Sequence, residues 1–246
     1  MFFNSCKQEN MMFFPEELPK EYTFTFNHPC KEINIKVDEN NFIDGLLFQC
    51  DSTKGLIFYL HGNAGSLRTW GEIAGIYLDN RYDFFIMDYR GFGKSSGNIS
   101  SEEQLYHDIQ TTYDTLKKGY KEENIIIIGY SIGTGPATWL ASKNKPGKLI
   151  LKAPYYNFPD LVQQHYKIIP SFMVRYKLQT NEYITKVKCP IIIFHGDKDE
   201  IINIKSSYKL KPLLKDNDKF IILKNQAHNG INYNVQYLTE LKDILE

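Results

Sequence analysis

The sequence predicts an α/β protein with a mostly parallel sheet and helices on both of its faces. From residue 56 onward, short apolar runs alternate with longer amphipathic stretches, as strands and helices do in such folds. The chain has 246 residues, of which 42% are hydrophobic and 24% charged, so it can bury a full core. We expect one domain over residues 21–246, preceded by an N-terminal extension over residues 1–20.

The strands fall into two groups along the chain. Residues 22–26, 33–37 and 42–49 alternate or run apolar between polar turns, which favours antiparallel strands. Later runs are apolar and too short for helices, which is typical of buried parallel strands. These runs are 56–60, 84–87, 125–128, 149–151, 191–194 and 220–223.

Helices are expected between the parallel strands. They cover residues 67–79, 101–119, 132–143, 204–215 and 232–245. In the last helix, Val235, Leu238, Leu241 and Leu245 recur on one face. Functional groups of parallel sheets gather in loops at the carboxyl ends of the strands, so chemistry is expected there.

Composition excludes several classes of function. The 29 Lys and Arg balance the 29 Asp and Glu, so no basic surface for nucleic acid is indicated. The four cysteines form no C-x-x-C pair, and neither a structural metal nor a cofactor is expected. No apolar run approaches the ~18 residues of a membrane-spanning helix.

Cys6 raises a question of location. A small residue before it and polar residues after it are similar to the end of a bacterial lipoprotein signal. The hydrophobic stretch that such a signal requires is missing, so the chain as given is expected in the cytoplasm. The alternative is a lipid-anchored protein of the cell envelope, with Cys6 in a truncated signal.

A candidate nucleophile follows the strand at 125–128. Residues 129–133 read Gly-Tyr-Ser-Ile-Gly and lead directly into a helix. A serine on this sharp strand-to-helix turn is strained, and the flanking glycines avoid clashes within the turn. Ser131 is the predicted nucleophile, and the Ile132 N–H is a predicted donor to a developing oxyanion.

A serine hydroxyl needs a base near neutrality that is oriented by a third group. His228 follows the strand at 220–223 and lies on a loop at the correct edge, so it is the predicted base. His61 and His195 each precede a glycine at a strand end, where a hydrogen bond that fixes the loop is expected. Asp199 is the predicted acid, and Asp197 is expected to bond backbone N–H groups of its turn.

The second oxyanion donor is expected in the loop after the strand at 56–60. Its glycines let the backbone approach a reacting carbonyl, and Asn63 is the predicted donor, with Ala64 as the alternative. Ser66 is expected to cap the next helix. Residues 88–97 lack the spacing of a phosphate-binding loop and predict a tight loop in which Arg90 is paired.

Residues 155–187 interrupt the alternation of strands and helices. The segment is rich in aromatic residues and broken by prolines, which favours a short cap insertion over the sheet edge. Apolar side chains there would shape a substrate pocket, with simple core packing as the alternative. The predicted substrate contacts are Tyr155, Phe158, Phe172 and Met173.

Five blocks in this order resemble the α/β-hydrolase superfamily across about residues 40–246. They are His-Gly-Asn-Ala-Gly at 61–65, Asp-Tyr-Arg-Gly-Phe-Gly at 88–93, residues 129–133, His-Gly-Asp-Lys-Asp at 195–199, and Ala-His-Asn at 227–229. The first two blocks, with the insertion after the sixth strand, are similar to membrane-associated depalmitoylases, lysophospholipid lipases and bacterial relatives. The resemblance implies an eight-stranded-type sheet and cleavage of acyl esters or thioesters.

The predicted function is therefore a cofactor-free serine hydrolase acting on esters or thioesters with apolar acyl groups through an acyl-enzyme. Its partner would be a small-molecule or lipid-like acyl ester. A peptidase or amidase of the same fold is one alternative, although residues 155–187 contain no acidic cluster to bind a peptide amine. A non-catalytic binding protein is the other, although such proteins usually lose one of the three catalytic residues.

Overall fold

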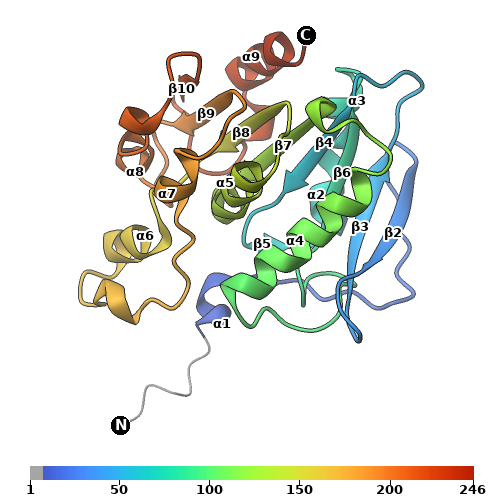
Figure 1. Cartoon of the computed structure of the whole chain (residues 1–246), viewed down its shortest axis with the longest axis horizontal. Coiled ribbons are helices and arrows are strands. Elements are labelled where there is room, and N and C mark those ends of the chain that lie inside the picture. The colour runs from blue at the N-terminus through green and yellow to red at the C-terminus, as the bar shows by residue number, and fades with distance from the viewer. Residues whose placement is uncertain (1–7) are drawn as a thin grey trace.

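The computed structural model describes residues 8–246 and is organised around one large sheet (Figure 1). Its strands and helices follow one another along the chain. They are α1 (Glu9–Met12), β1 (Phe14–Pro15), β2 (Cys30–Lys36), β3 (Phe42–Phe48), β4 (Leu56–Leu60), β5 (Ala64–Gly65), α2 (Leu67–Trp70), α3 (Ala74–Leu78), β6 (Asp83–Met87), α4 (Glu102–Leu116), β7 (Ile125–Tyr130), α5 (Thr134–Lys143), β8 (Lys148–Lys152), α6 (Phe158–His165), α7 (Thr180–Ile184), β9 (Ile191–Gly196), α8 (Ile204–Tyr208), β10 (Lys219–Leu223) and α9 (Val235–Leu245).

The large sheet has eight strands in the order β10-β9-β8-β7-β4-β6-β3-β2. Neighbouring strands from β10 to β6 are parallel, whereas β3 is antiparallel to both β2 and β6. This arrangement confirms the predicted α/β fold with a mostly parallel sheet, and each predicted parallel strand is present. The carboxyl ends of β7, β9 and β10 consequently open onto one edge.

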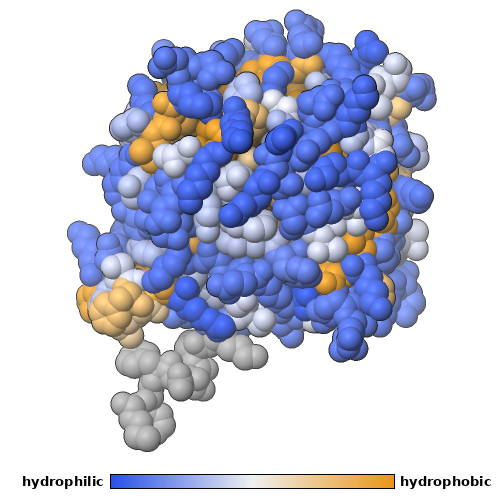
Figure 2. All heavy atoms as spheres, viewed as in Figure 1, coloured by the Kyte–Doolittle hydropathy of each residue, from blue (hydrophilic) through white to orange (hydrophobic). Residues whose placement is uncertain are grey.

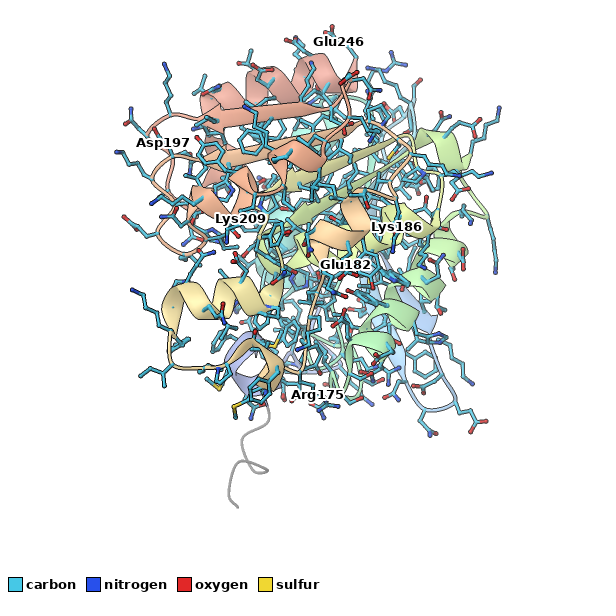
Figure 3. All side chains as sticks on the ribbon, turned by 60° about the vertical axis from the view of Figure 1, so that its left-hand side comes forward. Arg175, Glu182, Lys186, Asp197, Lys209 and Glu246 are labelled. Carbon is cyan, nitrogen blue, oxygen red and sulfur yellow. The ribbon has the colours of Figure 1, made fainter. Side chains whose placement is uncertain are left out.

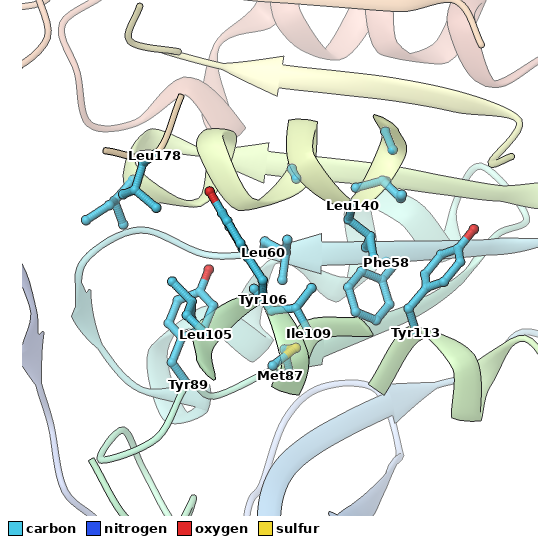
Figure 4. Close-up of a cluster of buried hydrophobic side chains, with 14 of the residues drawn as sticks. Phe58, Leu60, Met87, Tyr89, Leu105, Tyr106, Ile109, Tyr113, Leu140 and Leu178 are labelled. Carbon is cyan, nitrogen blue, oxygen red and sulfur yellow. The ribbon is translucent and has the colours of Figure 1, made fainter. Parts of the chain in front are cut away.

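Helices cover both faces of the sheet because side chains of each strand alternate between two cores. Phe58 and Leu60 of β4 face the core under α4 and α5, together with Ile109 and Leu140 (Figure 4). Tyr59 of the same strand faces the second core, under α3 and α9. Both cores are continuous across the central strands, which gives the site loops a rigid base.

The helical predictions are confirmed in place but not in every detail. The stretch 67–79 forms α2, a single 3-10 turn and α3, and the stretch 204–215 forms only the short α8 and a 3-10 turn. The predicted buried face of the last helix is partly wrong. Val235 and Leu238 are exposed, and the buried side chains of α9 are Tyr237, Leu241, Ile244 and Leu245.

The predicted strand at residues 22–26 is wrong. These residues pair with no strand. Phe24 and Phe26 stack on each other with ring centroids 6.2 Å apart, and Phe26 packs edge-on against Phe48 of β3. The alternating pattern places the aromatic side chains on one side of the segment, and their packing against the sheet needs no backbone pairing.

Residues 8–18 pack against the domain rather than extending from it. Met12 and Phe13 are buried, and β1 pairs in parallel with β5. Cys6, on which the lipoprotein alternative depends, lies outside the described residues. Within residues 8–246, no helix has the length and hydropathy needed to cross a membrane.

Candidate active site

Ser131 lies on the tight turn between β7 and α5. Its φ of 54° falls in the left-handed region, which is strained for a residue with a side chain. The turn needs glycine on both sides. A Cβ on Gly129 would lie 2.7 Å from the Cβ of Ala137, and one on Gly133 would overlap the carbonyl oxygens of Leu60 and His61. The turn therefore packs directly against the loop that follows β4.

Three sequence-predicted residues come together at this turn in one hydrogen-bonded series. The Nε2 atom of His228 lies 3.0 Å from the Ser131 hydroxyl oxygen. The Nδ1–H of the same ring donates to the Asp199 carboxylate at 2.7 Å. All three side chains are largely buried. An imidazole held between a hydroxyl and a carboxylate can accept the hydroxyl proton during nucleophilic attack.

The Asp199 carboxylate is held in its ionised form. Burial alone would raise its pKa, but hydrogen bonds from His195 and His228 and the charge of His228 outweigh burial and lower the pKa to about 2. Its second oxygen accepts the backbone N–H groups of Ile201 and Ile202 at 3.0 and 2.7 Å. The carboxylate thus remains a fixed negative charge beside the His228 ring.

The other aspartate of this turn has a different position. Asp197 is exposed and points into solvent (Figure 3). The prediction that it bonds backbone N–H groups is wrong, since no such bond forms within the described chain; Asp199 accepts them instead. His195 is buried, and its Nε2–H donates to the carbonyl of Ile202 at 2.8 Å, so it fixes the loop as predicted.

Side chains of β7 and β8 anchor the loop that carries His228 to the sheet. The hydroxyl of Tyr130 donates to the carbonyl oxygen of His228 at 2.8 Å, and the Tyr130 ring stacks on the imidazole with centroids 5.4 Å apart. Lys152, the strand neighbour of Tyr130, donates to the side-chain oxygen of Asn232 further along the same loop. Both ends of the loop are therefore tied to the sheet.

Lys152 is a fully buried lysine without an acidic partner among residues 8–246. Its side-chain nitrogen also donates to the hydroxyl of Tyr59 at 2.8 Å and lies over the rings of Tyr59, Tyr130 and Tyr237. Burial holds the pKa of Lys152 well below its ordinary value. Nothing in the sequence pattern distinguished this lysine, because its partners lie on four separate segments.

The loop after β4 borders the Ser131 turn on its other side. Ser66 caps α2 as predicted, with its hydroxyl oxygen accepting the Arg68 N–H. The Asn63 N–H has no protein acceptor within the described residues, whereas the Asn63 carbonyl accepts the Phe14 N–H at 2.7 Å. The Ile132 N–H lies in the first turn of a helical segment, where backbone donors lack intrahelical partners. Both are suited to receive a negative oxygen.

Two further loops support this arrangement. His61 is buried, with its Nδ1–H donating to the Gly62 carbonyl at 2.7 Å, as predicted for a residue that fixes its loop. The Tyr89 hydroxyl donates to the His61 carbonyl at 3.0 Å. Arg90 is paired as predicted, with Asp108 at 2.7 Å and with Asp38. These contacts hold the tight loop after β6 beside the loop after β4.

The four predicted substrate contacts occupy two different environments. Tyr155 is fully buried and its hydroxyl donates to the Ile132 carbonyl at 3.0 Å, and Phe158 is also buried. Phe172 and Met173 are 82% and 43% exposed. They therefore do not line an enclosed pocket in this structure. A hollow of about 260 Å³ in the same segment has polar lining residues, among them Asn157 and Asp160, and includes neither Ser131 nor His228.

Sequence reasoning missed the N-terminal contribution to the site. Residues 8–18 link the loop after β4, through Phe14 and Glu16, to residues 173–176 of the segment between β8 and β9. The available signal was the apolar run at residues 11–14, which lies between polar residues. Pairing of two-residue strands leaves no periodic pattern that could reveal it.

Comparisons with known proteins place the chain in a family. The family model described as serine aminopeptidase, S33, matches residues 51–182. An uncharacterised protein of Acanthamoeba polyphaga mimivirus is 30% identical over 234 residues, covering 85% of this chain and 79% of that protein. The alpha/beta hydrolase domain-containing protein 17C of Xenopus laevis is 30% identical over 223 residues, covering 85% of this chain and 68% of that protein.

Solved structures share the fold at lower identity. An esterase of Pyrococcus furiosus superposes with a TM-score of 0.75 at 17% identity, covering 95% of this chain and 96% of that one. An alpha-beta hydrolase of Vibrio vulnificus gives a TM-score of 0.74 at 20% identity, covering 88% and 81%. The chain therefore belongs to the α/β-hydrolase superfamily, within the family described as serine aminopeptidase S33 and as a relative of the alpha/beta hydrolase domain-containing 17 proteins.

Proposed function

We propose that this hydrolase cleaves carboxylic esters or thioesters with apolar acyl groups through an acyl-enzyme on Ser131. The observation that carries the proposal is the unbroken hydrogen-bonded series from Ser131 through His228 to Asp199. Such a series converts a weakly acidic hydroxyl into a nucleophile. The likeness to esterases and to the alpha/beta hydrolase domain-containing 17 proteins supports an ester or thioester as the bond that is cleaved.

The reaction follows from the positions of the groups. The Ser131 oxygen attacks the acyl carbonyl while His228 Nε2 takes its proton, and Asp199 stabilises the resulting imidazolium. The N–H groups of Ile132 and Asn63 receive the negative carbonyl oxygen. His228 returns the proton to the leaving alcohol or thiol. A water molecule, deprotonated by His228, then releases the acid and restores Ser131.

The first experiment compares the wild type with Ser131→Ala on p-nitrophenyl esters from acetyl to palmitoyl, on matching thioesters, and with a fluorophosphonate probe. Removal of a serine nucleophile is expected to lower kcat by about 10⁶ and to abolish labelling. The chain length with the highest kcat/KM would measure the acyl site. A folded wild type that neither labels nor cleaves would contradict the proposal and favour a binding protein.

The description of the matched family model favours one competing reaction, the removal of N-terminal residues from peptides. An aminopeptidase needs a carboxylate to bind the substrate amine, and Asp199 is already bonded to His228. Aminoacyl p-nitroanilides distinguish the two reactions. Cleavage of these anilides with a higher kcat/KM than the esters would replace the ester hypothesis by a peptidase.

A further inference from the structure

The side chain of Asp88 joins the two ends of residues 61–67, which we call the oxyanion loop because it carries the predicted donor Asn63. At the end of this loop, where α2 begins, both carboxyl oxygens of Asp88 lie 3.1 Å from the backbone nitrogen of Leu67. At its start, Oδ1 of Asp88 lies 3.4 Å from Nε2 of His61. One side chain from the loop after β6 therefore spans the whole oxyanion loop.

The contact between His61 and Asp88 requires one proton more than a neutral histidine and an ionised aspartate supply. Nδ1 of His61 lies 2.7 Å from the carbonyl oxygen of Gly62, and only an N–H can bond to a carbonyl, so Nδ1 carries the proton of a neutral ring. Nε2 then presents a lone pair, and it is buried without a hydrogen-bond partner among residues 8–246. An ionised carboxylate also offers acceptors alone. The contact becomes favourable when a further proton lies between the two atoms.

The surroundings of this pair exclude water. Neither side chain has any exposed surface, whereas the outer face of the molecule is largely hydrophilic, so that polar groups there remain hydrated (Figure 2). The His61 ring lies against the rings of Trp70, Tyr89 and Phe92, with centroids 5.6, 4.5 and 5.4 Å away. Two full charges in such a place would both lose their hydration, which favours a neutral pair.

The charged groups nearest to Asp88 also favour its neutral form. Burial raises the pKa of Asp88 and the charge of Glu16 raises it further, and together they outweigh the lowering by His61 and by a backbone N–H. Glu16 is itself paired with the exposed Arg68. Asp44 on β3 is a second acidic neighbour, and burial raises its pKa to about 8. Below pH 7 this neighbour therefore adds little charge of its own.

We propose that Asp88 is a neutral carboxylic acid that donates a hydrogen bond to His61 Nε2 and thereby positions the oxyanion loop beside Ser131. Its second oxygen accepts the Leu67 N–H. A Cβ on Gly93 would lie 1.9 Å from Oδ2 of Asp88, so the tight loop after β6 needs glycine at this position to admit the carboxyl group. The role of Asp88 as a positioning residue rests on the proposed function, whereas the location of the proton does not.

The first measurement locates the proton by ¹⁵N NMR of the histidine rings, with His61 assigned through bonds to its backbone. Between pH 5 and pH 7 we expect one protonated nitrogen, Nδ1, and one unprotonated nitrogen that accepts a hydrogen bond, Nε2. A doubly protonated ring would place the proton on His61 and overturn the proposal.

The second measurement counts the proton through stability. Asp88→Asn supplies an amide of the same shape, whose N–H donates without a proton from solvent. Above pH 5 the unfolded wild type and the unfolded variant bind equal numbers of protons, because aspartate is ionised there, but the native wild type holds one more. The folding constant of the variant relative to the wild type should therefore rise by up to about tenfold per pH unit from pH 5 to pH 7, as measured by denaturant unfolding.

A matched control is available on the preceding strand. Asp83 at the start of β6 is buried like Asp88, but it accepts the Cys50 N–H at 3.0 Å and the Tyr120 hydroxyl at 2.7 Å. A carboxylate that faces donors requires no proton of its own. Asp83→Asn should therefore show a constant ratio of folding constants over the same pH range.

The third measurement tests the positioning of the oxyanion loop. Asp88→Asn should keep kcat within about twofold, whereas Asp88→Leu leaves the Leu67 N–H and His61 Nε2 without partners. The leucine variant should lower kcat at least about tenfold with KM nearly unchanged, because the negative oxygen forms only after attack. Turnover is counted per site labelled by the fluorophosphonate probe, so that unfolded protein does not contribute.

Three results would contradict the proposal, and one would contradict only the proposed function. A constant ratio of folding constants for Asp88→Asn, a doubly protonated His61 ring, or equal losses of kcat in the asparagine and leucine variants would each overturn it. The first two decide the question even if Asp88→Leu does not fold. A protein that holds the proton as described but cleaves no ester would contradict the proposed function and leave the neutral acid in place.

Discussion

The loop that carries His228 and the segment from 155 to 187 both border the Ser131 turn, but their side chains have different surroundings. The loop is tied to the sheet through Tyr130 and Lys152, and His228 is nearly inaccessible. The segment contacts the turn through the buried Tyr155 and exposes its middle, where Ile168 is 95% accessible. The groups proposed to exchange a proton are held by buried hydrogen bonds, whereas the outer surface of the segment has few such contacts.

The comparison predicts its largest effect at Asp199. Asp199→Asn should lower kcat by about 10⁴, because an amide no longer stabilises the imidazolium and favours the wrong tautomer of His228. The measurement is steady-state hydrolysis of the best p-nitrophenyl ester. Asp197→Asn changes the same functional group two residues away at an exposed position and should have almost no effect. Equal losses in both variants would show that the turn as a whole, and not the buried carboxylate, matters.

Lys152 provides the next test, because it ties the loop that carries His228 to the sheet. Since burial depresses its pKa in the folded protein, the unfolded chain binds an extra proton between that value and the ordinary lysine pKa. The free energy of unfolding should therefore rise with pH over this window, by up to about 1.4 kcal/mol per pH unit. Denaturant unfolding between pH 7 and pH 10 measures the slope.

The variant Lys152→Met should remove this part of the slope, while Lys118→Met, at an exposed position on the surface, should keep it. A wild-type curve parallel to that of Lys152→Met would mean that the buried amine does not change its protonation on folding.

A smaller effect tests whether the loop after β4 is held in position by its hydrogen bonds, like the loop that carries His228. Phe14→Pro removes the N–H that donates to the Asn63 carbonyl and should lower kcat about tenfold, a fraction of the loss seen when an oxyanion donor is deleted. Phe14→Ala keeps this N–H and should behave like the wild type. If the two variants are equally active, the N-terminal segment does not position this loop.

The smallest effect compares one chemical change in the two regions. Ile193→Val removes a methylene from fully buried β9, which leads to Asp199, and should cost about 0.5–1.5 kcal/mol of unfolding free energy. Ile168→Val at the exposed turn after α6 should stay within about 0.5 kcal/mol of the wild type. Denaturant titrations at constant pH give both values. A comparable loss at Ile168 would mean that this turn is packed in solution.

The sequence was informative where structure is local. The apolar runs predicted every parallel strand of the eight-stranded sheet, and the turn residues around Ser131 and Asp199 are recognisable because glycine spacing and strand ends are local features. Residues 22–26 failed because an alternating pattern reports a buried side and says nothing about backbone partners. The exposure of Phe172 and Met173 was not predictable for a related reason, since apolar character does not reveal whether a side chain faces a pocket or solvent.

Contacts between distant segments left no pattern at all. Phe14 meets Asn63, and Lys152 meets Asn232, only after the sheet has assembled. The fold and the three hydrogen-bonded residues of the site could thus be predicted, whereas the support around them required coordinates.

The left-handed backbone conformation of Ser131 lowers the stability of the fold, although the side chain at this position is the proposed nucleophile. A residue with a side chain in this conformation costs roughly 1–2 kcal/mol relative to glycine, so Ser131→Gly would relax the turn while removing the hydroxyl. A screen that ranks variants by folding alone would favour this change. Any search for more stable forms of the protein must therefore score turnover as well, or it will discard the hydroxyl on which the proposed reaction depends.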